Sequence, residues 1–155
     1  MEYNPYALTG KTILVTGASS GIGRAVAIEC SRLGAHVILS ARNKEKLEET
    51  LKMMEGHGHQ VIECDLSKEK EVSLLIDEVP EIQGLVNNAG TTMTVPVPFI
   101  KFNVLSDLLK VNTIAPIMIL SGLVKKKKLR ANSSVVFTSS VSGLGRVSPG
   151  NTMYA

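Results

Sequence analysis

The chain of 155 residues has few of the features that mark secreted, metal-binding or membrane-spanning proteins. Its only cysteines, Cys30 and Cys64, lie far apart and lack the Cys-x-x-Cys spacing of metal or redox sites. No uninterrupted apolar run approaches the roughly 20 residues that a bilayer requires. Residues 1–10 lack the basic flank and apolar core of a secretory signal. These absences predict a cytoplasmic protein with free thiols and no membrane partner.

The composition is that of an ordinary soluble domain. Hydrophobic residues make up 44% and charged residues 20% of the chain, a length that suits one domain over residues 1–155. The net charge of +3 is mildly basic and favours anionic ligands without indicating nucleic acid. A lysine run at residues 125–128 could suggest a nucleic-acid patch, but it ends a predicted helix, where cations complement the helix dipole. His57 and His59 lie in a turn without further metal-ligand residues, so no metal site is predicted.

Strand and helix patterns alternate along the chain. Short β-rich runs predict strands at residues 11–16, 36–40, 60–64, 84–87 and 134–138. Apolar residues at helical spacing predict helices at residues 22–33, 44–55, 72–79 and 102–127, with a kink at Pro116. The strands are continuously apolar, as expected when helices cover both faces of a parallel sheet. The predicted fold is therefore a doubly wound, Rossmann-like α/β sheet, incomplete at its C-terminal side.

A glycine-rich turn, Thr-Gly-Ala-Ser-Ser-Gly-Ile-Gly at residues 16–23, joins the first strand to the first helix. Gly17 would permit the tight turn, Gly21 the close approach of a ligand, and Gly23 the packing of helix against strand. The unsatisfied amides and positive dipole end of that helix attract a pyrophosphate. The predicted cofactor-binding residues here are Gly17, Ser19, Ser20, Gly21, Ile22 and Gly23. The alternative is that these residues form only a turn between strand and helix and bind no ligand.

Further motifs follow this turn in a fixed order. Asn-Asn-Ala-Gly at residues 87–90 follows the fourth predicted strand, and Asp65 follows the third. Asn112 lies in the long helix, Ser139 and Ser140 follow the fifth strand, and Tyr154 comes shortly after. Together with the glycine-rich turn, this ordered set resembles the short-chain dehydrogenase/reductase family over residues 11–155.

The residues after the second predicted strand indicate which cofactor is preferred. An acidic side chain there would bind the ribose 2′-hydroxyl of NAD and repel a 2′-phosphate. This chain instead has Arg42, which can donate charge-assisted hydrogen bonds to that phosphate, as an arginine does in related members. Arg24, just inside the first predicted helix, could add to the positive electrostatic field around that phosphate. NADP(H) is therefore the predicted cofactor, and a solvated Arg42 without a ligand is the alternative.

The resemblance also assigns the remaining cofactor contacts. It implies that Asp65 meets the adenine, with Leu66 beside it in the binding set. It implies that Asn88, Ala89 and Gly90 line the adjacent ribose, and Asn87 is expected to tie neighbouring strands together.

The reacting groups are also implied by the resemblance. Tyr154 would supply a proton, Ser140 would hold the carbonyl oxygen, and Asn112 would hold a water that links a lysine to solvent. Ser139 and Ser142 are alternatives to Ser140, because the Ser140–Tyr154 spacing is about one residue longer than usual. A structural hydrogen bond is the alternative for Asn112. The lysine would fall at position 158, so we expect a natural chain of roughly 250 residues in one domain.

The predicted function is that of an oxidoreductase. It would transfer a hydride between NADP(H) and a small-molecule carbonyl or alcohol, as a 3-oxoacyl-carrier-protein reductase or a broad carbonyl reductase does. By resemblance, the chain would assemble as a homodimer or homotetramer. The alternative is a non-catalytic nucleotide-binding module, or an inactive fragment, because fold alone does not decide function.

Overall fold

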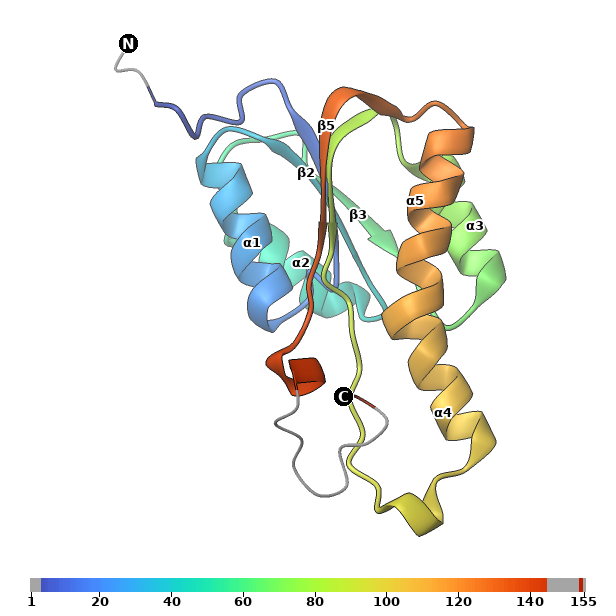
Figure 1. Cartoon of the computed structure of the whole chain (residues 1–155). Coiled ribbons are helices and arrows are strands. Elements are labelled where there is room, and N and C mark those ends of the chain that lie inside the picture. The colour runs from blue at the N-terminus through green and yellow to red at the C-terminus, as the bar shows by residue number, and fades with distance from the viewer. Residues whose placement is uncertain (1–3, 145–153, 155) are drawn as a thin grey trace.

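The computed structural model describes residues 4–144 and residue 154, and contains one five-stranded parallel sheet (Figure 1). The strands are β1 (Thr12–Thr16), β2 (His36–Ala41), β3 (Gln60–Glu63), β4 (Ile82–Asn87) and β5 (Leu129–Phe137). Their order across the sheet is β3-β2-β1-β4-β5, and each neighbouring pair is parallel. This arrangement confirms the predicted doubly wound fold, and the strand order reverses between β1 and β4.

Helices cover both faces of the sheet (Figure 1). The helices α1 (Gly21–Arg32) and α2 (Lys44–Lys52) pack on one face, and α3 (Glu69–Glu78) and α5 (Ala115–Lys125) pack on the other. Short 3₁₀ turns occur at Val97–Phe99 and Val141–Leu144. Each crossover returns the chain to the same edge of the sheet, so the carboxyl ends of all five strands lie at one edge.

Two apolar clusters hold these layers together. Leu14 and Ile38 point toward α3 and α5, whereas Val15 and Val37 point toward α1 and α2. All four side chains are at most 2% exposed. Successive residues of a strand face opposite sides of the sheet. The interior positions of β1 and β2 must therefore be apolar on both faces, which is the pattern that the sequence shows.

The long predicted helix is divided into three parts. An α-helix, α4 (Phe102–Leu109), leads into a π-helical turn, η2 (Lys110–Ile114), and then into α5. Pro116 lies in the first turn of α5 and has no backbone N–H. The carbonyl of Asn112 therefore lacks its α-helical donor, which favours a wider turn at this point. The predicted irregularity is present, but it precedes the proline.

The same segment corrects one expectation about length and hydropathy. The helical stretch Phe102–Lys125 has 24 residues and a mean hydropathy of 1.5 in its most apolar window, which is long and apolar enough to cross a membrane by those two measures alone. Counting only uninterrupted apolar runs missed it, because Asp107 and Lys110 divide the run. A core helix of a soluble protein passes the same test. Here 28% of that window is buried, and Ile119 and Leu123 are fully buried in the core between this helix and the sheet.

The lysine run after α5 has a structural role. The Nζ atom of Lys128 donates to the carbonyl oxygens of Ile76, Asp77 and Val79 at 2.9, 2.7 and 2.6 Å. The Lys126 ammonium pairs with the Asp77 carboxylate. The cations thus complement a helix end, as expected, but the helix capped by Lys128 is α3 rather than the one that the lysines follow.

Candidate active site

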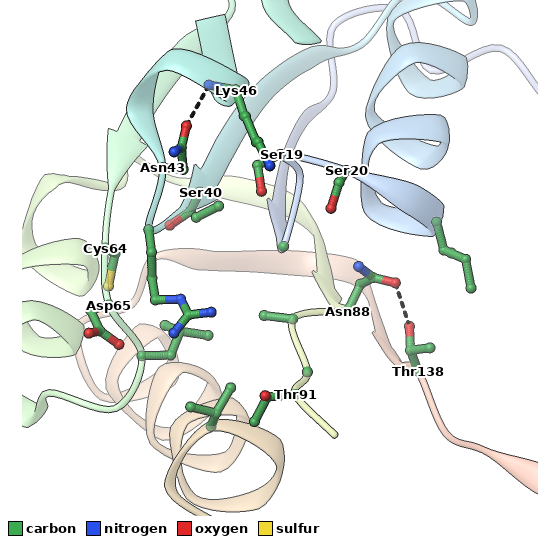
Figure 2. A pocket seen from close by; sticks show the side chains of 18 of the residues that line it. Ser19, Ser20, Ser40, Asn43, Lys46, Cys64, Asp65, Asn88, Thr91 and Thr138 are labelled. Atoms are coloured by element: carbon green, nitrogen blue, oxygen red, sulfur yellow. Dashed lines mark hydrogen bonds between the residues drawn. The ribbon is translucent and has the colours of Figure 1, made fainter. Parts of the chain in front are cut away.

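A pocket of about 520 Å³ opens at the carboxyl edge of the sheet (Figure 2). It lies where β1 and β4 are neighbours, the position at which doubly wound folds bind their ligands. Eleven of the predicted site residues line it: Gly17, Ser19, Ser20, Ile22, Arg42, Asp65, Leu66, Asn88, Ala89, Gly90 and Tyr154. Four predicted residues are outside its lining: Gly21, Gly23, Asn112 and Ser140. The fold therefore gathers segments far apart in the sequence into one site.

The glycine-rich turn enters the pocket from the end of β1. Gly17 has a φ of 70° and Gly21 a φ of 54°, a region that residues with a Cβ rarely adopt. The amides of Gly17 and Ala18 both donate to the Ser40 carbonyl, at 2.8 and 3.2 Å, so β2 supports the turn. Gly23 packs directly under the turn, because a Cβ there would lie 2.3 Å from the Gly17 carbonyl oxygen.

The backbone amides at the helix end of this turn, those of residues 19–23, have no acceptor among the described residues. Ser20 caps α1 without a side-chain hydrogen bond, and the first turn of α1 contains no acidic residue. The partial positive charge of the helix end therefore faces the pocket uncompensated, as a phosphate group requires.

Replacing Gly23 with alanine should destabilise the protein strongly. The new methyl group would collide with the Gly17 carbonyl and with the Asn88 side chain, which would lie 2.5 Å away. We expect a loss of about 3 kcal/mol in the free energy of unfolding, measured by urea denaturation. Gly21→Ala is the comparison: it meets no atom within 4 Å. It should cost only about 1–2 kcal/mol of backbone strain. Equal losses in the two variants would contradict this packing.

The Asn-Asn-Ala-Gly segment is fixed to β1 through Thr16, which is 1% exposed. The Thr16 Oγ1 accepts from the amides of Asn88 and Ala89, both at 3.1 Å. The Asn88 side chain reaches back to the Thr16 carbonyl at 3.4 Å. On the other side, Thr138 Oγ1 donates to Asn88 Oδ1 at 3.4 Å. The sequence reasoning missed Thr16 and Thr138, although both stand at the carboxyl ends of strands.

Asn87 does not tie strands together through its side chain, contrary to expectation. Its side chain is 3% exposed, and neither its Nδ2 nor its Oδ1 has a hydrogen-bond partner among the described residues. The tie between β4 and β5 at this point is made by the backbone, where the Thr138 amide donates to the Asn87 carbonyl at 2.9 Å.

Two cationic side chains line the pocket beyond the end of β2. Arg42 and Lys46 both contribute to its wall, and no described residue forms an ion pair with either. Asn43 caps α2, where its Oδ1 accepts from the Lys46 amide at 2.8 Å (Figure 2). Sequence reasoning missed Lys46, although its place one helical turn after Arg42 was a usable signal.

Arg24 does not add its charge to the pocket in the expected way. Its guanidinium donates to the Ser19 carbonyl at 2.6 Å and to Thr50 Oγ1 at 3.0 Å, and it lies 3.4 Å from the Glu49 carboxylate. Arg24 is absent from the pocket lining. The cationic charge at the pocket therefore comes from Arg42, which precedes α2, and from Lys46 on α2, rather than from α1.

The loop after β3 forms the opposite wall. Burial raises the pKa of the Asp65 carboxyl, but two hydrogen bonds from Ser67 and the nearby Arg42 and Lys68 cations outweigh it, so that pKa lies below its usual range. The Ser67 amide and hydroxyl donate to Asp65 Oδ1 at 3.0 and 2.8 Å. Asp65 is therefore an ionised residue that shapes this turn, with Leu66 buried beside it.

Cys64 also lines the pocket but is chemically inert. Burial, followed by the nearby carboxylates of Glu71, Asp65 and Glu78, raises the pKa of its thiol to about 12. Only the thiolate is a strong nucleophile, and it is scarcely populated near neutral pH at that pKa.

Of the predicted reacting groups, Tyr154 is the one that lines the pocket. It is half-buried there. Ser140 is half-buried beyond the end of β5, where its Oγ accepts from the Ser142 amide at 3.2 Å, and it is absent from the pocket lining. The alternative Ser139 is exposed and also outside the lining. Residues 145–153, which connect these serines to Tyr154, lie outside the described residues. The choice among the serines stays a prediction.

Asn112 makes the structural contact that was the alternative to a relay. Its Oδ1 accepts from the Thr91 amide and its Nδ2 donates to the Thr91 carbonyl, both at 2.8 Å. The side chain thereby holds the segment after Gly90 against η2. A role in proton relay would use the remaining hydrogen-bonding capacity of this residue and stays a prediction.

The parallel sheet, the glycine-rich turn and the pocket at the switch point define a dinucleotide-binding class of α/β protein. The family model described as short chain dehydrogenase matches residues 11–155. The chain therefore belongs to the short-chain dehydrogenase/reductase family, whose members generally bind NAD(H) or NADP(H).

Several characterised proteins are similar to this chain. The 3-oxoacyl-[acyl-carrier-protein] reductase FabG of Rickettsia felis is 33% identical over 147 residues, which cover 95% of this chain and 60% of the relative. The 3-ketodihydrosphingosine reductase of Mus musculus is 35% identical over 150 residues, covering 90% of this chain and 45% of the relative. A solved structure of the promiscuous reductase LugOII superposes with a TM-score of 0.86 at 28% identity, covering 95% of this chain and 62% of that one. The chain thus spans about half of the length of the curated relatives that it matches.

Proposed function

We propose that this protein is an NADP(H)-dependent oxidoreductase that transfers a hydride between the nicotinamide and a carbonyl or alcohol substrate. The observation that carries the proposal is the pairing of two elements in one pocket. The free amides of the glycine-rich turn lie on one side, and Arg42 and Lys46 lie on the other.

The cations support NADP(H) over NAD(H). Arg42 and Lys46 stand beyond the end of β2, where an acidic side chain would be needed to bind a ribose 2′-hydroxyl. A guanidinium can make two parallel hydrogen bonds to a phosphate, and the capped start of α2 adds a favourable dipole. Asp65 is the only carboxylate among the described residues that line this pocket, and it is already engaged by Ser67.

The reaction divides between cofactor and protein. When bound, NADPH supplies the hydride that the carbonyl carbon accepts, and the carbonyl oxygen then needs one proton. Tyr154, the pocket-lining phenol, donates that proton. Ser140 donates a hydrogen bond to the same oxygen and so stabilises its developing charge. In the oxidation direction each transfer reverses.

The substrate class follows from the relatives' names. The Rickettsia protein is named for a 3-oxoacyl substrate and the mouse protein for 3-ketodihydrosphingosine. Both names specify a ketone at a third carbon. We therefore propose a ketone of this kind, or the corresponding alcohol, as the substrate.

Assembly into a homodimer or homotetramer is part of the proposal. Apolar side chains on the outer side of α4 and α5 are exposed, including Phe102 at 87% and Ile117 at 56%. Exposed apolar side chains of this kind favour association with a second copy.

A turnover assay separates the enzyme from the non-catalytic alternative. The purified protein is mixed with NADPH and a 3-oxoacyl thioester, and loss of the reduced nicotinamide absorbance is followed, with NADH and a saturated acyl thioester as controls. We expect NADPH to be consumed only with the ketone. Tight NADPH binding without consumption across a panel of ketones would favour the nucleotide-binding module.

A further inference from the structure

Arg24 and Thr50 contact the glycine-rich turn from its rear side. Thr50 Oγ1, on α2, lies 3.0 Å from the carbonyl oxygen of Ala18, and both residues are fully buried. The same hydroxyl accepts a hydrogen bond from Arg24 Nε at 3.0 Å. Arg24 Nη2 in turn donates to the Ser19 carbonyl at 2.6 Å. These two side chains, the Arg24–Thr50 clamp, thus hold two consecutive carbonyls of the turn.

The single hydroxyl proton of Thr50 can satisfy only one carbonyl at a time. The Lys46 carbonyl also lies 3.0 Å from Thr50 Oγ1, but it is inside α2, where the helical ladder already supplies a donor. No other described residue donates to the Ala18 carbonyl. A buried carbonyl without a donor is costly, so the proton is best placed on Ala18. Arg24 Nε donates to a lone pair of the same hydroxyl oxygen, so the hydroxyl proton remains available for the Ala18 carbonyl.

Peptide geometry converts this clamp into an orientation of the amides. In a trans peptide the C=O and the N–H point in opposite directions. No described peptide bond is cis. Because the carbonyls of Ala18 and Ser19 point to the clamp, the amides of Ser19 and Ser20 point away from it. Ser19 and Ser20 both line the pocket, and their amides have no described acceptor.

We infer that the Arg24–Thr50 clamp is a positioning device for cofactor binding. It fixes two peptide planes of the turn so that the Ser19 and Ser20 amides meet the pyrophosphate of the dinucleotide. Neither Arg24 nor Thr50 lines the pocket, so both act through the backbone rather than by touching the ligand. The inference rests on the proposed function, because it requires a dinucleotide in this pocket.

A purely structural role makes a different prediction. If the two side chains only joined α1 to α2, their loss would displace α2 and with it Arg42 and Lys46. Binding would then weaken for every ligand that uses the 2′-phosphate. The clamp, by contrast, affects only ligands that carry the pyrophosphate.

Thr50→Val is the sharpest variant, because it removes the hydroxyl while keeping the charge and nearly the shape. Dissociation constants are measured for NADPH and for adenosine 2′-monophosphate, which has the 2′-phosphate but no pyrophosphate. We expect NADPH binding to weaken about tenfold and adenosine 2′-monophosphate binding to change less than about twofold, which corresponds to one lost hydrogen bond. Unchanged NADPH binding, or an equal loss for both ligands, would overturn the inference.

Variants of Arg24 test the same device independently of how well Thr50→Val folds. Arg24→Met should reproduce the selective loss of NADPH binding, and Arg24→Lys should restore part of it, because one ammonium can reach the Ser19 carbonyl. Arg32→Met is the matched control, since Arg32 is on the same helix but pairs with Glu29 and Glu55 at the surface. A loss with Arg32→Met equal to that with Arg24→Met would overturn the clamp.

Different results would overturn the Arg24–Thr50 clamp and the proposed function. A wild-type protein that binds adenosine 2′-monophosphate as tightly as NADPH would overturn the clamp, because the pyrophosphate would then contribute nothing. A wild-type protein that binds neither ligand would overturn the proposed function, and the clamp with it.

Discussion

Replacing Tyr154 with phenylalanine is expected to reduce NADPH-dependent ketone reduction by about 10²- to 10⁴-fold, the range typical for loss of a positioned acid–base group. The substitution removes only the phenolic hydroxyl, and Tyr154 lines the pocket to which we assign the cofactor. The dissociation constant of NADPH should change little, because the proposed phosphate contacts are made by the glycine-rich turn, Arg42 and Lys46. Steady-state turnover and a separate nucleotide titration measure the two effects.

Tyr6→Phe provides a matched control for this variant. Tyr6 is 75% exposed, lies in the segment before β1 and is absent from the pocket lining. Its substitution should leave both turnover and nucleotide binding unchanged. Full activity in Tyr154→Phe would rule out the tyrosine as the proton donor. The next candidate would then be Thr138, the hydroxyl-bearing pocket residue that directly follows β5.

Replacing Arg42 with aspartate is expected to reverse the cofactor preference. The change removes charge-assisted hydrogen bonds to the 2′-phosphate and adds a repulsive carboxylate at the same place. We expect the ratio of NADPH to NADH affinity to fall by about 10²- to 10³-fold, which corresponds to two charged hydrogen bonds. Titration of both nucleotides into wild-type and variant protein gives this ratio.

Arg32→Asp is the control for the cofactor switch, because it makes the same charge change on an exposed part of α1. It should leave the ratio unchanged within error, since exposed charges beyond about 10 Å are screened at ordinary ionic strength. An unchanged ratio in Arg42→Asp would show that Arg42 is solvated and that the 2′-phosphate is recognised elsewhere or not at all.

The sequence was sufficient to predict the sheet and the place of the glycine-rich turn. A strand with successive apolar residues, such as residues 13–15, must be covered by helices on both faces of the sheet. Gly17 and Gly21 carry positive φ values where the pattern placed them. The strand ends shifted by a residue or two, and β5 begins at Leu129 rather than at residue 134. Its first half is exposed and polar, which gives no periodic signal.

Side-chain partners could not be predicted in the same way. Arg24 was expected to add positive charge near the cofactor, but its guanidinium donates to Thr50 and to the Ser19 carbonyl, and Thr50 comes close to it only through folding. Lys46 takes that place because the Asn43 cap sets the start of α2. Asn112 was predicted from its place in the long helix, and its actual partner, Thr91, is brought near by the chain that leaves β4.

The most direct test of the account is a calorimetric titration of the wild-type protein with NADPH and with NADH. We predict that NADPH binds at least about tenfold more tightly, the contribution of one charged hydrogen bond to the 2′-phosphate. The difference should shrink as salt is added, because it is electrostatic. NADH binding as tight as NADPH binding, or no binding of either nucleotide, would contradict the assignment of this pocket.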